Sequence, residues 1–473
     1  MAGVIDGITG VNSGLPISNM VTAIVNAEKA PKEAQLARLE KSTTTKFSAL
    51  GELKSALSAF QTAMKDLNSA TLFEKRTAVS SNTSTLTASA SKTATPGTYN
   101  IEVQSLATAS KVATAAVAGG FSSGASEQTL TVKLGAGDTG TAVTIAAGSD
   151  LASTRDQLNA ALKDQGISAT IVNNPVNGES RLVFSSTETG ADNDLIVTGT
   201  GNLSALDVDG SIALNSGDAG SAGYIVQAAN AEFTIDGLAL SSTTNKVSGA
   251  IADVDFELLE KTETGKSVTL TVGQDNDGVK ASIKTFVDAY NKLISTSNKL
   301  TSVTKVGEDG TPLVGGLVGD STVRNLLSGV RNELVNPSGH GGVRVLADLG
   351  ITTQKDGTLK TDDSKLDTAL QNDFDAVGAF FTGDTGLMSR VDKRIDGFIQ
   401  TGGILDQRMK ALESTRSDIK TQTENLNRRV EQMQTRLLAQ FNAMDALVGQ
   451  LKSTGDQLAQ VFASLPGVTK KDS

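Results

Sequence analysis

The fold is decided by a stretch near the C-terminus, residues 405–451, with the sequence LDQRMKALESTRSDIKTQTENLNRRVEQMQTRLLAQFNAMDALVGQL. Its apolar residues hold one register of alternating steps of three and four, with Arg416, Thr423 and Gln440 in the polar slots, which is the heptad pattern of a helix that packs along one seam. At about 1.5 Å per residue, such a helix would be roughly 70 Å long. The stretch therefore predicts one long helix with a partner helix beside it. The seam consists of Met409, Leu412, Ile419, Leu426, Val430, Met433, Leu437, Met444, Leu447 and Leu451.

Two other segments carry the same spacing and are the expected partners of this helix. The first would lead into the middle of the chain and the C-terminal helix would lead back, so these two are predicted to be antiparallel. Pro31 is expected to break or kink the first helix, because the residue before a proline is disfavoured in the α region. The predicted intramolecular coiled-coil seam consists of Leu50, Leu53, Leu57, Phe60, Met64 and Leu67 in the first segment, Val279, Ile283, Phe286 and Tyr290 in the second, and Met409, Leu412, Ile419, Leu426 and Val430 in the C-terminal helix.

The two ends of the chain carry further apolar faces. Chain ends are usually poorly ordered unless they dock, and burial of apolar surface contributes about 25 cal/mol per Å². A lone helix has nothing against which to bury such a face, so we predict that both ends bind partner helices. The residues concerned are Ile17, Met20, Val21, Ile24 and Val25 near the N-terminus, and Leu437, Leu438, Phe441, Met444, Leu447, Val448, Leu451, Leu458, Val461 and Phe462 near the C-terminus.

The middle of the chain, residues 74–274, is rich in Thr, Ser, Gly and Val, and its apolar residues alternate with polar ones as in β-strands. A helix is predicted at 150–163 with Ser149 as its cap, and a hairpin at 350–359 with its turn at Asp356 and Gly357. The predicted strands are 98–103, 129–134, 169–173, 181–185, 195–198, 231–235, 254–259 and 267–272.

The predicted fold is a multidomain α+β chain, with antiparallel terminal helices that form a coiled-coil or helical-bundle leg and with nested β-rich head domains in the middle. The expected divisions are leg helices at 1–36 with 437–473, a helical bundle with a small hairpin at 37–77 with 275–436, a β-rich head domain at 78–110 with 228–274, and an inserted β-rich distal head domain with one helix at 111–227.

The composition argues against several classes of catalytic and ligand-binding site. The chain has no Cys, which excludes disulfides and thiolate catalysis, and it has one His, which excludes a His-rich metal site. Its 42 Lys+Arg and 52 Asp+Glu give a net charge of −10, which disfavours a nucleic-acid or anionic-membrane binder. With 14 Phe, 3 Tyr and no Trp, it offers few base-stacking platforms. We therefore expect a contact protein rather than an enzyme, without cofactor or metal.

Three motifs imitate ligand sites. Residues 135–140 spell G-x-G-x-x-G, but a dinucleotide site needs a helix to follow, and 141–145 alternates as a strand does, which favours a hairpin. Asp275 and Asp277 imitate a calcium loop whose first and last ligand positions are a glycine and a lysine, so helix capping explains them better. His340 lies in a glycine-rich segment and is expected to be an exposed loop histidine.

Neither a signal peptide nor a membrane span is expected. The first ten residues lack a basic start and an apolar core, and no run of about 18 apolar residues occurs in the sequence. Export by a system that reads no cleavable signal stays open.

The chain resembles the flagellar filament cap family, also called hook-associated protein two. The resemblance covers nearly the whole chain and is weakest over 109–227, although 150–193 is similar to an insertion module of flagellins. The segments that carry it are Ser13-Gly14-Leu15-Pro16-Ile17, Leu50-Gly51-Glu52-Leu53, Pro96-Gly97-Thr98-Tyr99, Phe233-Thr234-Ile235-Asp236-Gly237-Leu238, Leu349-Gly350-Ile351 and Asp356-Gly357-Thr358-Leu359.

The resemblance implies export through the flagellar type III channel and assembly as a pentameric or hexameric ring at the distal tip of the filament, outside the cell. Such a cap blocks flagellin leakage and promotes flagellin insertion, folding and filament elongation for motility. The implied partners are further copies of the chain, flagellin, the hook-filament junction protein and a cytoplasmic export chaperone on the C-terminal helix. Nucleic acid and membrane insertion are not implied.

An alternative and compatible function is that of a surface adhesin, in which the Thr/Ser/Gly-rich segment 109–227 binds host glycans or proteins. An enzyme is a distant third possibility. The net charge of −10 is consistent with solubility but indicates no partner.

Overall fold

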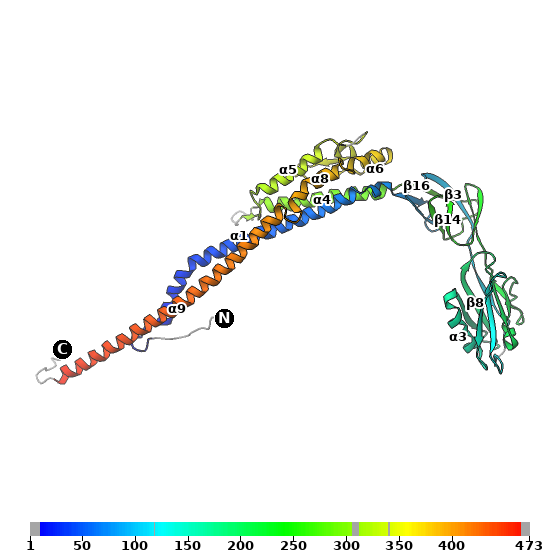
Figure 1. Cartoon of the computed structure of the whole chain (residues 1–473), viewed down its shortest axis with the longest axis horizontal. Helices are drawn as coiled ribbons and strands as arrows, with labels where there is room; N and C mark the ends of the chain where they lie inside the picture. Colours follow the sequence, from blue (N-terminus) through cyan, green and yellow to red (C-terminus); the bar gives the residue numbers. More distant parts are fainter. Residues whose placement is uncertain (1–9, 118, 305–311, 339–340, 465–473) are drawn as a thin grey trace. The chain divides into compact units, whose positions relative to one another are not determined.

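The computed structural model of the chain (Figure 1) describes residues 10–117, 119–304, 312–338 and 341–464. The chain divides into two compact units. We call Met1–Ala70 with Asn276–Ser473 the helical unit, and Thr71–Asp275 the β unit.

Two long helices at the ends of the chain form one side of the helical unit. Helix α1 (Ile17–Leu67) and helix α9 (Ile404–Ser464) run side by side (Figure 1). Lys54 Nζ lies 3.9 Å from a carboxylate oxygen of Asp406, and the Arg416 guanidinium lies 5.4 Å from the centre of the Phe47 ring. Because the position on α9 rises as the position on α1 falls, the two helices are antiparallel, as predicted.

Helix α1 is continuous through Pro31, so of the two predicted alternatives, a break or a kink, the break is wrong. Its path does change direction in its N-terminal part (Figure 1), so α1 bends without ending. At 61 residues, α9 is about 90 Å long, because it continues to Ser464, beyond the heptad stretch.

The bundle core forms where α4 (Asn276–Thr301) packs against α1. The ring centre of Phe60 lies 5.5 Å from that of Phe286 and 5.7 Å from that of Tyr290. All predicted seam residues of α1 and α4 are buried. On α9, Ile419 is buried, but Met409, Leu412, Leu426 and Val430 are only half-buried. The α9 seam is thus less covered than the heptad pattern suggests, because fewer elements surround it.

The described residues of the helical unit also form the shorter helices α5 (Ser321–Val335), α6 (Asp363–Asn372), α7 (Phe374–Phe381) and α8 (Leu387–Ile399). Helix α8 packs against α1, α5 and α9. Asp320 caps α5 by accepting from the Thr322 amide at 2.9 Å, and its other oxygen lies 2.5 Å from the Arg408 guanidinium, which ties α5 to α9. The predicted hairpin is β19 (Ile351–Thr353) with β20 (Leu359–Thr361), and a second one is β17 (Val303–Thr304) with β18 (Leu313–Val314).

The β unit contains two groups of sheets and begins with the short helix α2 (Ala70–Glu74). In the first group, a five-stranded sheet of order β1-β16-β3-β12-β13 shares one apolar core with a three-stranded sheet of order β14-β15-β2. Phe233 and Phe256 meet edge to face in that core, with ring centres 5.7 Å apart. The strands are β1 (Arg76–Ser80), β2 (Leu86–Ala90), β3 (Gly97–Ser105), β12 (Ala231–Ile235), β13 (Leu238–Ser242), β14 (Lys246–Ile251), β15 (Val254–Leu258) and β16 (Val268–Gln274).

The second group has two four-stranded sheets, of order β10-β9-β5-β6 and β11-β4-β8-β7, with helix α3 (Leu151–Leu162) and a core of its own. The G-x-G-x-x-G segment joins β5 to β6 as a hairpin, as predicted. Gly135 has a φ of 79°, and a Cβ there would collide with the Asp192 carbonyl. The strands are β4 (Ala109–Ala113), β5 (Gln128–Leu134), β6 (Thr141–Ile145), β7 (Ile167–Asn173), β8 (Ser180–Thr189), β9 (Leu195–Gly199), β10 (Val208–Asp209) and β11 (Gly223–Val226).

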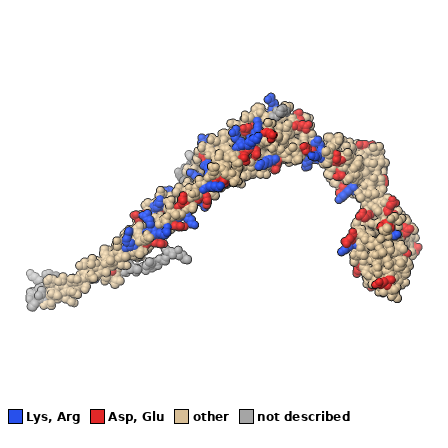
Figure 2. All heavy atoms as spheres, in the orientation of Figure 1, with Lys and Arg blue, Asp and Glu red and all other residues tan. Residues whose placement is uncertain are grey.

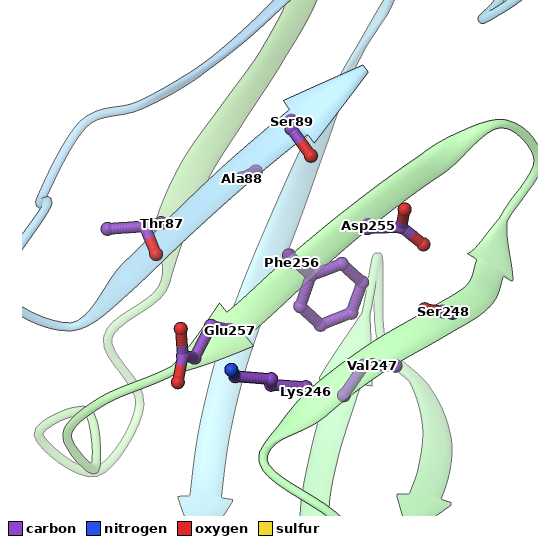
Figure 3. Close-up of a pocket in the computed structure, with 9 residues that line it drawn as sticks. All are labelled: Thr87, Ala88, Ser89, Lys246, Val247, Ser248, Asp255, Phe256 and Glu257. Atoms are coloured by element: carbon purple, nitrogen blue, oxygen red, sulfur yellow. The ribbon is translucent and has the colours of Figure 1, made fainter. Parts of the chain in front are cut away.

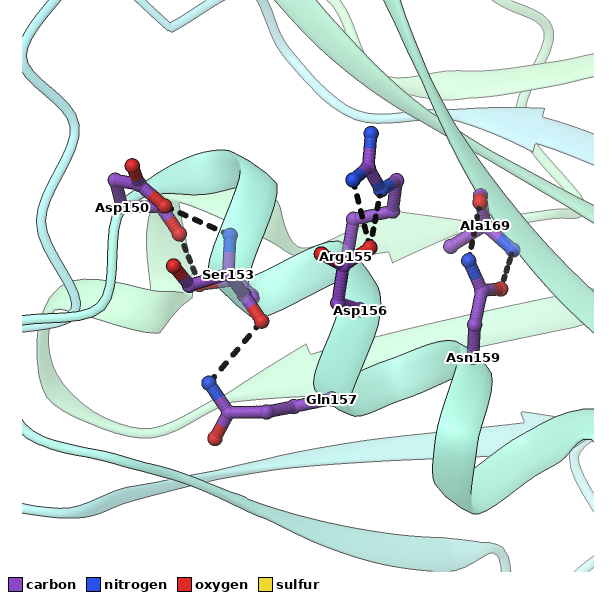
Figure 4. A network of polar contacts seen from close by, with 8 residues as sticks. Asp150, Ser153, Arg155, Asp156, Gln157, Asn159 and Ala169 are labelled. Carbon is purple, nitrogen blue, oxygen red and sulfur yellow. Dashed lines mark hydrogen bonds and ion pairs between the residues drawn. The ribbon is translucent and has the colours of Figure 1, made fainter.

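The cap of α3 differs from the prediction (Figure 4). Asp150, not Ser149, is the N-cap, and its carboxylate accepts from the Ser153 amide at 2.7 Å. This hydrogen bond lowers the pKa of Asp150 below its usual value. Ser149 instead accepts from the Gln157 side chain and donates to the Ala146 carbonyl. Serine and aspartate are both common N-cap residues. Here the Ser149 side chain closes the preceding turn instead, which leaves Asp150 as the cap.

Candidate functional site

The last part of α9 presents an apolar surface that no described residue covers. We call Met444, Leu447, Leu451, Leu458, Val461 and Phe462 the terminal stripe. Their exposed fractions lie between 43% for Met444 and 66% for Leu451. Their steps of three, four and seven residues place them along one side of the helix. A contiguous exposed apolar face of this kind marks a surface for another protein.

The opposite terminus does not present such a face. Ile17, Val21 and Val25 are buried, and Val430, Met433, Leu437, Leu438 and Phe441 of α9 pack against them. In the free chain, the predicted partner helix of these residues is therefore α9 of the same chain. Because α1 begins opposite this part of α9, the two apolar faces cover one another. Met20 and Val448 are half-buried and Ile24 is exposed.

A polar contact, which we call the clasp, holds the residues before α1 onto α9. The buried carboxylate of Asp445 accepts from the Ser13 amide at 2.8 Å, from the Ser13 hydroxyl at 2.5 Å and from the Asn12 amide at 3.2 Å. The hydrogen bond from the Ser13 hydroxyl is the main reason why the pKa of Asp445 lies below its usual 3.8. Asn12 and Val11 border a hollow whose α9 residues include Gly449 and Asp456. With about 3.6 residues per turn, these positions lie on the side of α9 opposite the stripe. The terminal stripe therefore stays open.

The clasp was not predicted from the sequence. Its signal was an acidic residue between the seam residues Met444 and Leu447, where an aspartate needs a hydrogen-bonding partner if it is buried. The sequence does not say that this partner lies more than 400 positions away, at Asn12 and Ser13.

Replacing Asp445 with alanine is expected to release residues 11–16 from α9 and to loosen the first turns of α1. Their amide hydrogens should then exchange faster in hydrogen–deuterium exchange than in the parent chain. Because the pKa of Asp445 is lowered in the folded state, its stabilising contribution is present above about pH 3.8 and is lost as the pH falls through the lowered value. Asp456→Ala, an exposed aspartate on the same side of α9, is the control. Unchanged exchange in the Asp445 variant would contradict a role for the clasp.

In the described part of the chain, few features are typical of a catalytic site. Among those residues, no group of His, Asp and Glu could hold a metal ion. A hollow of about 370 Å³ lies over β2, β14 and β15 (Figure 3). Lys246 and Glu257 lie side by side in it, but Thr87, Ser89 and Asp255 lie apart from them on the three strands, so its polar side chains do not gather around one point. His340 and the predicted signal-free first residues lie outside the described residues. No described helix is both long and apolar enough to cross a bilayer.

The described part of the chain thus combines antiparallel terminal helices, an open apolar stripe and a β-rich middle. Family models match the chain as flagellar hook-associated protein 2 N-terminus over 13–110, flagellar hook-associated protein 2 C-terminus over 228–453, and flagellin hook IN motif over 129–188. The chain belongs to the flagellar hook-associated protein 2 family, which confirms the predicted resemblance. This is a structural flagellar family rather than a known enzyme family.

Relatives and a solved structure agree with this assignment. The A-type flagellar hook-associated protein 2 of Pseudomonas aeruginosa is 54% identical over 98% of both chains. Flagellar hook-associated protein 2 of Escherichia coli K12 is 33% identical over 96% of this chain and 97% of its own. The crystal structure of the D1-D2-D3 domains of the Escherichia coli flagellar cap protein FliD matches with a TM-score of 0.57 and 33% identity, and it covers 77% of this chain and 99% of that one.

Proposed function

We propose that this chain is the cap at the distal tip of a flagellar filament, where it retains exported flagellin and promotes its insertion, folding and addition to the filament. The family membership and the likeness to a flagellar cap protein support this proposal. The single observation that carries it at the level of residues is the terminal stripe, an apolar surface that is still open in the isolated chain.

In this proposal the stripe, with Val448 beside it, docks on the end of the filament. Burying a Leu, Val or Phe side chain contributes about 1.5–3 kcal/mol, so six such residues can hold a subunit without covalent chemistry. The entropic cost of ordering the chain end is then met when the partner binds. Ile17, Val21 and Val25 take part only if α1 separates from α9, because α9 covers them in the free chain. Met20 and Ile24 remain accessible on α1.

The finer parts of the proposal concern assembly and delivery. Copies of the chain form a pentameric or hexameric ring, reach the tip through the flagellar type III channel, and follow the hook-filament junction protein in the structure. A cytoplasmic export chaperone binds the C-terminal helix before export, and the open stripe supplies an apolar surface for it. The four predicted segments would act as leg, bundle, head and distal head. Adhesion through 111–227 stays a prediction.

Removal of the stripe tests the proposal. A chain that ends at Ala446 keeps the clasp at Asp445 and the cluster around Val21, but it loses most of the stripe. In a strain without its own cap protein, the full chain should restore filament growth. The truncated chain should fold, as judged by circular dichroism, yet leave flagellin in the medium as unassembled subunits. Filaments of normal length from the truncated chain would contradict the proposal.

A further inference from the structure

The acidic excess of the chain lies entirely in the β unit. Residues 71–275 contain 22 Asp and Glu against 11 Lys and Arg, a balance of −11. The rest of the chain contains 30 Asp and Glu against 31 Lys and Arg, a balance of +1, which together gives the net charge of −10. The two units therefore differ in kind: one is strongly acidic and the other is neutral.

The pairing of charges follows the same division. Among the described residues, nine ion pairs lie in the helical unit, for example Arg408 with Asp320 and Lys280 with Asp367. Three lie in the β unit. Figure 2 shows basic and acidic groups mixed over the helical unit, whereas few basic groups interrupt the β unit in that view. Most carboxylates of the β unit therefore add to one outward negative field instead of cancelling locally.

We propose that repulsion between the β units of neighbouring copies opposes self-association of this chain, so that salt promotes its assembly. The inference rests on the proposed function only in that a cap requires copies to stand side by side. The Debye length falls from about 30 Å at 0.01 M salt to about 8 Å at 0.15 M. Two β units, each with a charge of −11, therefore repel one another over a longer distance in dilute buffer than in saline. An interface held by opposite charges would respond in the opposite direction.

The experiment measures self-association of the full chain by sedimentation velocity in 10 mM and in 150 mM NaCl. We expect the apparent association constant to rise by about tenfold with salt, since fields of this kind change association rates by about tenfold or more. A variant with five exposed acids of the β unit neutralised should associate in 10 mM NaCl nearly as strongly as the parent does in 150 mM. Its substitutions are Glu127→Gln, Asp164→Asn, Glu188→Gln, Asp255→Asn and Glu260→Gln, which change the balance of the β unit from −11 to −6.

A matched control removes the same amount of charge from the helical unit. It carries Asp288→Asn, Asp384→Asn, Asp396→Asn, Asp418→Asn and Glu424→Gln, all at exposed positions. The self-association of this control should depend on salt as that of the parent does. Such a result would assign the salt response to the charge of the β unit, and not to net charge or to stronger apolar contacts in salt.

Association that is weakened or unchanged by salt would overturn the inference, as would an equal response of the two variants or the lack of association at either salt concentration. Filament growth in the complementation assay is a separate readout. Restored growth with salt-independent association would leave the cap function standing and reject only the electrostatic control of assembly.

Discussion

A chain with Leu447, Leu451 and Phe462 replaced by glutamate is expected to fold normally and to fail to support filament growth. These three side chains are between 57% and 66% exposed, so a charge on each costs the isolated chain little. In a docked complex, however, each substitution removes about 1.5–3 kcal/mol of the free energy that apolar burial contributes to binding. A total loss of about 5 kcal/mol would weaken binding by more than about a thousandfold. Counting filaments by electron microscopy in a cap-deficient strain measures the effect.

The control changes the net charge by the same amount on the opposite side of α9. Lys452→Gln, Ser453→Glu and Gln460→Glu alter residues that line the hollow beside Asn12 and lie outside the stripe, and together they change the charge by −3, as the three stripe substitutions do. This variant should grow filaments at close to the parental number. Loss of growth in both variants would assign the effect to charge anywhere on α9, and growth in both would remove the stripe from the docking surface.

Phe286→Ala is expected to lower the free energy of unfolding of the helical unit by about 3–5 kcal/mol. Its ring is fully buried, with its centre 5.5 Å from that of Phe60 and 6.5 Å from that of Phe381. Truncation therefore leaves a cavity between α1, α4 and α7 that rigid helices fill only partly. Urea unfolding followed by hydrogen–deuterium exchange, which distinguishes the two units along the sequence, measures the change.

The matched variant in the other unit is Phe256→Ala, because Phe256 is 3% exposed and packs edge to face on Phe233. It should destabilise the first group of sheets in the β unit and leave protection of α1 and α4 unchanged. If each substitution lowered the stability of both units equally, the chain would unfold as one cooperative body, and the division into two units would have no thermodynamic meaning.

Regular local patterns explain what the sequence could predict. Alternation of apolar and polar residues predicts a strand at 231–235, and β12 has these bounds. Heptad spacing likewise locates α1, α4 and α9, because α1 and α4 each bury one face and α9 lays its apolar face along α1 over part of its length. These signals depend on neighbouring residues alone, which is why they survive without knowledge of the fold.

Features that depend on distant residues could not be predicted. The bundle core uses Val377, Phe380 and Phe381 of α7, a helix too short to show a period. Pro31 stays inside α1, since packing on either side outweighs one lost hydrogen bond. For the candidate site, the open stripe follows from the sequence pattern. The burial of Val21 and its neighbours by α9 does not, because it depends on where α1 begins relative to α9.

The clasp has a practical consequence for labelling. Through Ser13 and Asp445, the start of the described chain is fixed to the same helix that carries the stripe, about 30 Å of helix before Ser464. On the proposed function, an affinity tag or fluorescent protein joined to the end of α9 would lie near the stripe and would hinder its docking. The turn between β7 and β8 is a better place for a short epitope. Val176 there is 92% exposed, and the space around Gly178 is empty.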